Sequence, residues 1–138
     1  SSDVCSSDLL ANFLLLFLFF ISFFLLDSTN KWATCPVGYF MGGLYRTGKN
    51  HWLHNIEEAR CCKPEGLPDK YADCYNENVW GSFDGKGLSE CKREGYYMAG
   101  IFRGKCDKLY CLEEFKCCRM IGKRDDIITY IISWDYAW

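Results

Sequence analysis

The chain has 138 residues with ten cysteines and a formal charge of −2, enough for one modest domain and too short for a multi-domain enzyme. Three of its 18 acidic side chains and none of its 16 basic ones fall in residues 1–30, so residues 31–138 carry a net charge of +1. That part lacks the basic footprint of a nucleic-acid-binding protein. It holds nine of the ten cysteines, about 8% of its residues, which is typical of a secreted disulfide scaffold.

Residues 1–9 read SSDVCSSDL, with two aspartates and with neither a basic residue nor an initiator methionine. A signal peptide begins with a positively charged region, so this start does not fit one. The nonapeptide resembles the translation of a common sequencing adapter. We interpret it as an assembly artefact that replaced the true start, and we leave Cys5 out of the predicted disulfide framework.

Residues 10–28 are predicted to be a secretory signal peptide. Leu10 to Leu26 is an apolar run with Asn12 as its only strongly polar member, and polar residues follow it. A transmembrane anchor is the alternative, but about 17 residues is the lower limit for a membrane span, and no Lys or Arg flanks the run. We expect cleavage between Ser28 and Lys31, and therefore a secreted, extracellular protein.

The rest of the chain repeats itself. The matching blocks are GYFMGGLYR at 38–46 with GYYMAGIFR at 95–103, and LHNIEEARCC at 53–62 with LYCLEEFKCC at 109–118. Each unit opens with a cysteine, Cys35 or Cys91, and closes with a Cys-Cys pair, which gives a period of about 56 residues. We predict two tandem cysteine-rich repeats over 31–75 and 91–120, joined by a structured loop at 76–90.

Within each unit the first block is rich in aromatic residues, contains a glycine and predicts a β-strand. The second block fits a helix or a strand. We favour a strand because consecutive cysteines on a strand point to opposite faces and can bridge in two directions. The predicted fold class is small, all-β and disulfide-rich. Residues 121–138 end in an apolar, aromatic stretch and are interpreted as the start of a truncated downstream segment.

Comparison of the two repeats predicts the disulfides. Cys106 and Cys111 are absent together from repeat 1, which indicates that they pair with each other. The opening cysteine of each unit should pair with one member of the closing pair: Cys35 with Cys61 or Cys62, and Cys91 with Cys117 or Cys118. If Cys74 takes the member that Cys35 leaves over, one cysteine of the second closing pair has no partner in this chain. A missing C-terminal part or a covalent dimer would supply that partner.

Catalytic residues, metal sites and cofactors are not predicted. His51 and His54 have an H-x-x-H spacing, but they lie in a spacer and the second repeat has no histidine. The cysteines lack the paired C-x2-C spacing of zinc ribbons. Aromatic side chains are the candidate ligand-binding residues, because so small a core has little room for them and such rings anchor ligands. They are Tyr39, Tyr45, Trp52, Trp80, Tyr96 and Tyr97; the alternative is that they form the core.

With Cys-x2-GYFMGGLYR, HNIEEARCC and CYNENVWGSFDGKGLSEC in place, residues 31–120 resemble the cysteine-rich N-terminal repeats of secreted invertebrate proteins of the biomphalysin type. That resemblance implies the targeting part of a longer defence protein with an aerolysin-like pore-forming module. Membrane contact would then come only through that module. We expect a binding module for a cell-surface or extracellular ligand, with a carbohydrate as one candidate, and without a nucleic-acid partner.

The chain is also similar to dermatopontin, whose units end in Cys-Cys-Arg as at Cys117-Cys118-Arg119. The Asp-Arg-x-Trp motif of that family is missing here; Asn55-Ile56-Glu57-Glu58 stands in its place in the first repeat. This similarity implies the alternative function, an extracellular matrix or adhesion protein that self-associates.

Overall fold

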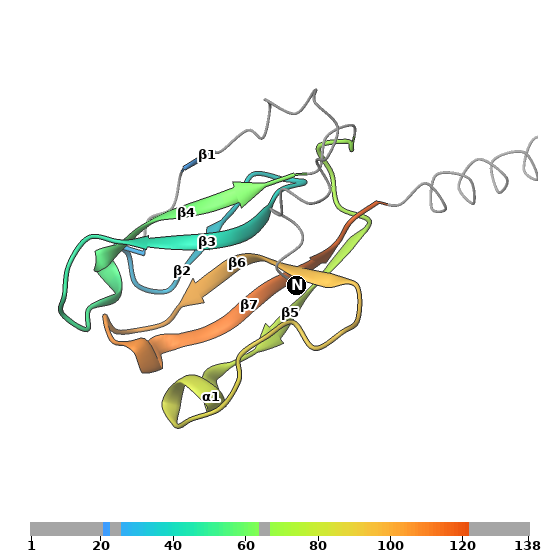
Figure 1. Cartoon of the computed structure of the whole chain (residues 1–138). Coiled ribbons are helices and arrows are strands. Elements are labelled where there is room, and N and C mark those ends of the chain that lie inside the picture. The colour runs from blue at the N-terminus through green and yellow to red at the C-terminus, as the bar shows by residue number, and fades with distance from the viewer. Residues whose placement is uncertain (1–20, 23–25, 64–66, 122–138) are drawn as a thin grey trace, which may run out of the picture.

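Residues 21–22, 26–63 and 67–121 are described by the computed structural model, and they form a small all-β fold rich in disulfides, as predicted (Figure 1). The predictions for residues 1–9, and for nearly all of 10–28 and 121–138, lie outside the described residues.

Two antiparallel sheets build the fold. The first contains, in order, β1 (Ile21–Ser22), β4 (Ile56–Cys62) and β3 (Phe40–Arg46). The second contains β2 (Lys31–Thr34), β6 (Tyr96–Arg103), β7 (Leu112–Arg119) and β5 (Asp73–Asn78). The short helices are α1 (Trp80–Asp84) and two 3-10 turns, η3 (Leu53–Asn55) in the β3–β4 connection and η4 (Leu109–Cys111) in the β6–β7 connection. The predicted loop at 76–90 therefore contains half of β5 and all of α1.

The β3–β4 and β6–β7 hairpins have the same register. In the first hairpin Met41 lies opposite Cys61, Gly43 opposite Arg60, and Tyr45 opposite Glu58. The equivalent pairs of the second hairpin are Met98 with Cys117, Gly100 with Lys116, and Phe102 with Glu114. In both hairpins the strand register shifts at the same two places. One shift lies between the methionine and the glycine two residues after it, and the other lies just before the final arginine. The second block of each unit is thus a strand after one 3-10 turn, and not a long helix.

The two hairpins are joined by strands that cross between the sheets. β2 precedes β3 in the sequence, yet it pairs with β6, with Lys31 opposite Arg103 and Thr34 opposite Gly100. The Cys35 amide extends this ladder by donating to the Ala99 carbonyl at 2.9 Å. β5 pairs with β7, so the predicted boundary after residue 75 runs through a paired strand. The hairpins therefore belong to one interlocked body, and a duplication of the whole unit stays a prediction.

The main core lies between the sheets. It joins Ala59 and Cys61 of β4 to Ile101 of β6 and Phe115 of β7, with Leu26 at its N-terminal side. Burial of such side chains supplies most of the stability of a small domain. Leu26 is fully buried although it falls inside the predicted signal peptide. Cleavage between Ser28 and Lys31 would remove it from this core.

Four disulfides are described: Cys35–Cys61, Cys91–Cys117, Cys106–Cys111 and Cys74–Cys118. The first three agree with the predicted pairings. The prediction that Cys74 pairs with Cys61 or Cys62 is wrong, because β5 lies against β7 and places Cys74 opposite Cys118. The predicted unpaired cysteine at 117 or 118 is wrong for the same reason. Cys62 is also disulfide-bonded, so all cysteines of the described residues are oxidised.

β2 lies so close to β6 that a side chain at position 100 would clash with it, and this explains why Gly100 is a glycine. A Cβ atom on Gly100 would lie 2.7 Å from Thr34 Cγ2 and 3.2 Å from the Ala33 carbonyl oxygen, whereas one on Gly43 would meet only Arg60 Cβ, at 3.9 Å. We expect Gly100→Ala to lower the free energy of unfolding by about 1–3 kcal/mol through overpacking. The matched variant Gly43→Ala should be neutral or slightly stabilising. Denaturant unfolding of both oxidised proteins measures this, and equal losses would contradict the assignment.

Candidate functional site

The structure separates the six predicted aromatic residues into two groups. Tyr39 is buried in the core, while Tyr96 and Tyr97 are half-buried and pack edge-on against Tyr75 at 5.1 Å and Phe40 at 6.0 Å. These three belong to the interior. The exposed members are Tyr45, Trp52 and Trp80.

Two of the exposed aromatics lie at the end of the molecule where the hairpin connections meet. Trp52 precedes η3 and forms a bridge with Lys108, which precedes η4. Helix α1, which begins at Trp80, packs against η4, and η4 itself exposes Leu109 and Tyr110. We call this group of four exposed side chains the connection surface: Trp52, Trp80, Leu109 and Tyr110. Tyr45 lies apart from it on β3.

Helix α1 presents Trp80 to solvent because its other face is anchored. Val79 is buried and its amide donates to the Glu113 carbonyl at 2.9 Å, while the Phe83 ring packs on Phe115 at 5.9 Å. Residues four apart lie on one face of a helix, so Val79 and Phe83 face the core together and Trp80 does not. The exposure of Trp80 therefore follows from how the helix docks.

Trp52 is held by a cation above its ring. Lys108 Nζ lies 3.3 Å from the ring centroid, and the His54 ring stacks nearly parallel at 6.2 Å. A cation–π contact at a half-exposed site contributes about 0.5–1 kcal/mol. Trp52 is therefore fixed in orientation, with polar donors beside its exposed part.

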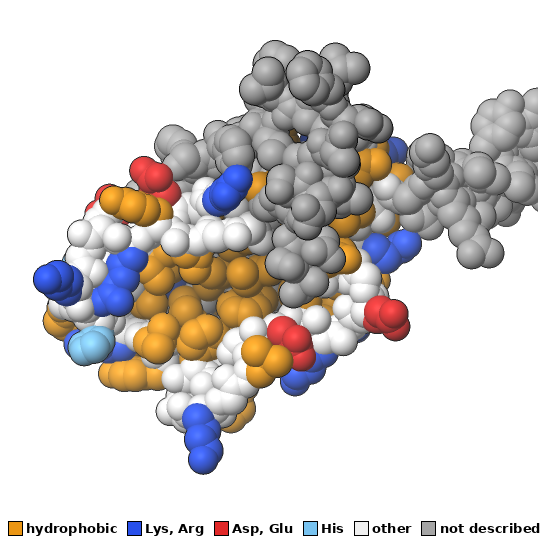
Figure 2. All heavy atoms as spheres, in the orientation of Figure 1, with side chains coloured by type: hydrophobic (Ala, Val, Ile, Leu, Met, Phe, Trp, Pro, Cys, Tyr) orange, Lys and Arg blue, Asp and Glu red, His pale blue; other side chains and the backbone are white. Residues whose placement is uncertain are grey.

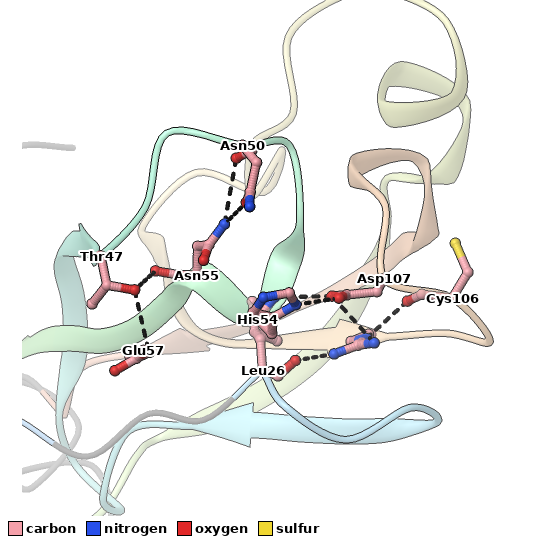
Figure 3. A network of polar contacts seen from close by, with 9 residues as sticks. Leu26, Thr47, Asn50, His54, Asn55, Glu57, Cys106 and Asp107 are labelled. Carbon is pink, nitrogen blue, oxygen red and sulfur yellow. Dashed lines mark hydrogen bonds and ion pairs between the residues drawn. The ribbon is translucent and has the colours of Figure 1, made fainter.

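An ionic network ties the two connections together (Figure 3). The Arg103 guanidinium is buried, donates to the carbonyls of Leu26 and Cys106, and pairs with the Asp107 carboxylate at 3.2 Å. Asp107 also accepts the His54 amide at 2.9 Å and contacts Nδ1 of the His54 ring. Asp107 thus links the connection of one hairpin to that of the other, which sets the spacing of Trp52 and η4.

The Asp107 carboxyl has a pKa below its ordinary value. Its burial raises the pKa, but the hydrogen bonds from His54 and the charge of Arg103 outweigh that effect. Because the folded-state pKa is depressed, this carboxylate stabilises the fold above the ordinary pKa of 3.8, and that contribution is lost as the pH falls through the folded-state value.

The β3–β4 connection replaces a disulfide with a pair of amides (Figure 3). Asn55 occupies the position of Cys111 and is equally buried, and its side-chain amide donates to Asn50 Oδ1, at the position of Cys106. Both pairs are five residues apart in the sequence. A hydrogen bond in one hairpin and a disulfide in the other therefore close equivalent loops.

Sequence reasoning missed Lys108, Leu109, Tyr110 and Asp107 as parts of a surface. The signal for them was the short segment CDKLYC, in which a disulfide closes so small a loop that its long side chains cannot all turn inward. The contact across the hairpins to His54 had no sequence signal.

No protein-family model, curated protein or solved structure gives a significant match to this chain. Among residues 21–22, 26–63 and 67–121 there is also no helix with the length and apolar character needed to cross a membrane.

The paired asparagines predict that the short disulfide is replaceable. We expect Cys106→Asn with Cys111→Asn to fold and be secreted, because the same pair already closes the equivalent loop at 50–55. The loop-entropy model assigns about 2 kcal/mol to so short a closure, against about 3.5 kcal/mol for the Cys91–Cys117 loop. Cys91→Ser should therefore be retained or degraded. Equal loss of secretion in both variants, measured by immunoblot, would contradict this ranking.

Arg103 and Arg46 form a matched pair for a second test, because they are equivalent in the two hairpins but only Arg103 is buried. Removing one member of a buried ion pair costs about 3–5 kcal/mol, while the exposed Arg46, which donates to the Asn50 carbonyl, should matter little. Arg103→Ala should lower the melting temperature sharply and Arg46→Ala by a few degrees at most. Similar calorimetric midpoints for the two variants would refute the network.

Proposed function

We propose that this protein is a secreted, disulfide-stabilised, non-enzymatic binding module whose connection surface recognises an extracellular or cell-surface ligand, with a glycan as the favoured class. The observation that carries the proposal is the grouping of four large exposed apolar side chains on three neighbouring short elements. Contiguous exposed apolar surface on a small protein marks an interaction site, and Trp and Tyr dominate binding energy at such sites.

Rigidity supports the proposal. Cys106–Cys111 closes the loop that carries Leu109 and Tyr110, and the Arg103–Asp107 pair holds that loop against the rest of the fold. A pre-ordered surface loses little conformational entropy on binding. A flexible loop would lose more conformational entropy on binding.

The chemistry of the surface suits a sugar. Aromatic rings offer flat faces for the apolar side of a pyranose, and Lys108 and His54 place hydrogen-bonding groups beside Trp52. These polar groups would orient the hydroxyls. A nucleic acid is a poor partner because residues 31–138 carry a net charge of only +1 and lack a basic footprint.

Secretion belongs to the same proposal. Disulfides persist in oxidising compartments, and the described residues of this small fold hold four of them. A role as the targeting part of a longer defence or pore-forming protein rests on the resemblance over residues 31–120.

A glycan array probed with the full oxidised chain tests the function. We expect binding to a subset of glycans, and a loss of at least about 30-fold in affinity for Trp80→Ala with Tyr110→Ala, since anchor residues contribute 2 kcal/mol or more. Val37→Ala is the matched control, because Val37 is an exposed apolar residue outside the connection surface. Absence of binding to any glycan or cell surface, or equal loss in the control, would overturn the proposal.

A further inference from the structure

One edge of the first sheet is open. β3 pairs with β4 on one side only, and no strand of the described residues is hydrogen-bonded to its other side, although β6 lies near that side and contacts β3 at Phe40 (Figure 1). Natural sheet edges are guarded by charges, prolines or short length. β5 carries Asp73 and Glu77 and β2 has four residues, but β3 is seven residues long and reads FMGGLYR.

The equivalent edge of the other hairpin is covered. β6 has the same register to its partner as β3, yet β2 occupies its second side. Ile101 of β6 is 2% exposed, whereas its equivalent on β3, Leu44, is 46% exposed. Phe102 of β6 packs on Trp32 at 5.3 Å between ring centroids, whereas its equivalent on β3, Tyr45, is 60% exposed. β3 therefore carries the apolar residues of a covered strand without its cover.

The equivalent glycines of β6 and β3 also indicate that β3 lacks the strand that covers β6. Gly100 is needed because β2 brings Thr34 within reach of any Cβ there, and β3 has Gly43 at the equivalent position although only Arg60 comes within 4 Å. A hollow of about 290 Å³ lies over Gly43, Tyr45 and Arg60. Figure 2 shows hydrophobic side chains exposed between the β3 and β6 ribbons of Figure 1, on the side of β3 away from β4.

The chain also contains a segment equivalent to β2. β2 is the four residues directly before the opening cysteine Cys35, and residues 87–90, GLSE, stand directly before Cys91. Within the described chain, Leu88, Ser89 and Glu90 make no backbone–backbone hydrogen bond, and Leu88 is 74% exposed. The Ser89 hydroxyl contacts that of Ser82 on α1.

We infer that residues 87–90 of one copy of this chain add as a strand to the β3 edge of a second copy, as β2 adds to β6 within the chain. The occupant is a second copy because, within the described residues, segment 87–90 and the outer side of β3 both lack a strand partner, while their equivalents, β2 and β6, bind each other inside the chain. Backbone hydrogen bonds of strand addition would supply affinity, and alternate side chains specificity.

The β2–β6 register predicts the contacts. Trp32 lies opposite Phe102 and Thr34 opposite Gly100, so Leu88 should lie over Tyr45 and Glu90 over Gly43. Arg60 is opposite Gly43 across the β3–β4 pair, which places a positive charge beside the incoming Glu90. The two most exposed apolar residues of these segments would thus cover each other, with opposite charges at the end of the strand.

Such a contact joins two different surfaces of the chain. It closes into a two-fold dimer where two copies exchange the segment reciprocally, and otherwise gives larger rings or open chains. This inference does not rest on the proposed ligand binding, since Leu88 and Tyr45 lie outside the connection surface. The strand addition and the ligand binding can therefore be tested independently.

Complementation between two variants tests the inference. Leu88→Lys disables the donor segment and Tyr45→Lys the acceptor edge, while both leave the disulfides and the core intact. In sedimentation velocity of the oxidised full chain, the wild type should form concentration-dependent oligomers and each variant alone should remain monomeric. An equimolar mixture restores one good contact per pair and should give dimers only.

Val37→Lys is the control, since it adds the same charge at an exposed apolar site elsewhere and should associate like the wild type. A wild type that stays monomeric at all concentrations overturns the inference. So does Leu88→Lys that associates like the wild type, which would indicate β3–β3 pairing or another occupant, and so does a mixture that remains monomeric.

Discussion

The fold depends on adjacent cysteines at the end of each hairpin. Because neighbouring residues of a strand face opposite sides of the sheet, Cys117 reaches Cys91 on one face while Cys118 reaches Cys74 of β5 on the other. A chain with so few buried apolar side chains needs covalent links to stay folded. These two bridges fix the second sheet, against which the β3–β4 hairpin and α1 then pack. The connection surface inherits its geometry from that arrangement.

The second governing feature is the exchange of strands between units. β2 belongs by sequence to the first hairpin and by pairing to the second, which buries Ile101 and Arg103 and makes glycine necessary at 100. Among the described residues no strand pairs with the outer side of β3, and the equivalent residues Leu44 and Tyr45 are exposed. Exposure at Leu44 and Tyr45 is thus a consequence of topology, and their residue types match the covered strand. The connection surface and the β3 edge are two separate regions of exposed apolar side chains that the small core does not bury.

Much of this was readable in the sequence, because local patterns determine local structure. The repeated blocks predicted both hairpins, and the joint absence of Cys106 and Cys111 predicted their disulfide. Pairing between distant segments had no such signal: the sequence does not say that β5 lies along β7, and so the Cys74 partner was predicted wrongly. For the same reason three of six aromatic candidates were interior residues, since alternation along a strand does not say which face another sheet will cover. Asp107 and His54 meet across 53 residues of sequence, beyond any local pattern.

One hairpin edge is covered by β2 within the chain, and we infer that the equivalent edge of the other hairpin binds a second copy. Amide hydrogen exchange of the oxidised chain, followed residue by residue at low and high protein concentration, compares the two edges. We expect slow exchange along β6 at every concentration. Those amides of Gly43–Arg46 that point away from β4 should exchange fast in dilute solution and more slowly as concentration rises, together with the amides of residues 87–90. If these outward amides are already protected in dilute monomer, or if their exchange does not change with concentration, the β3 edge does not bind a second copy.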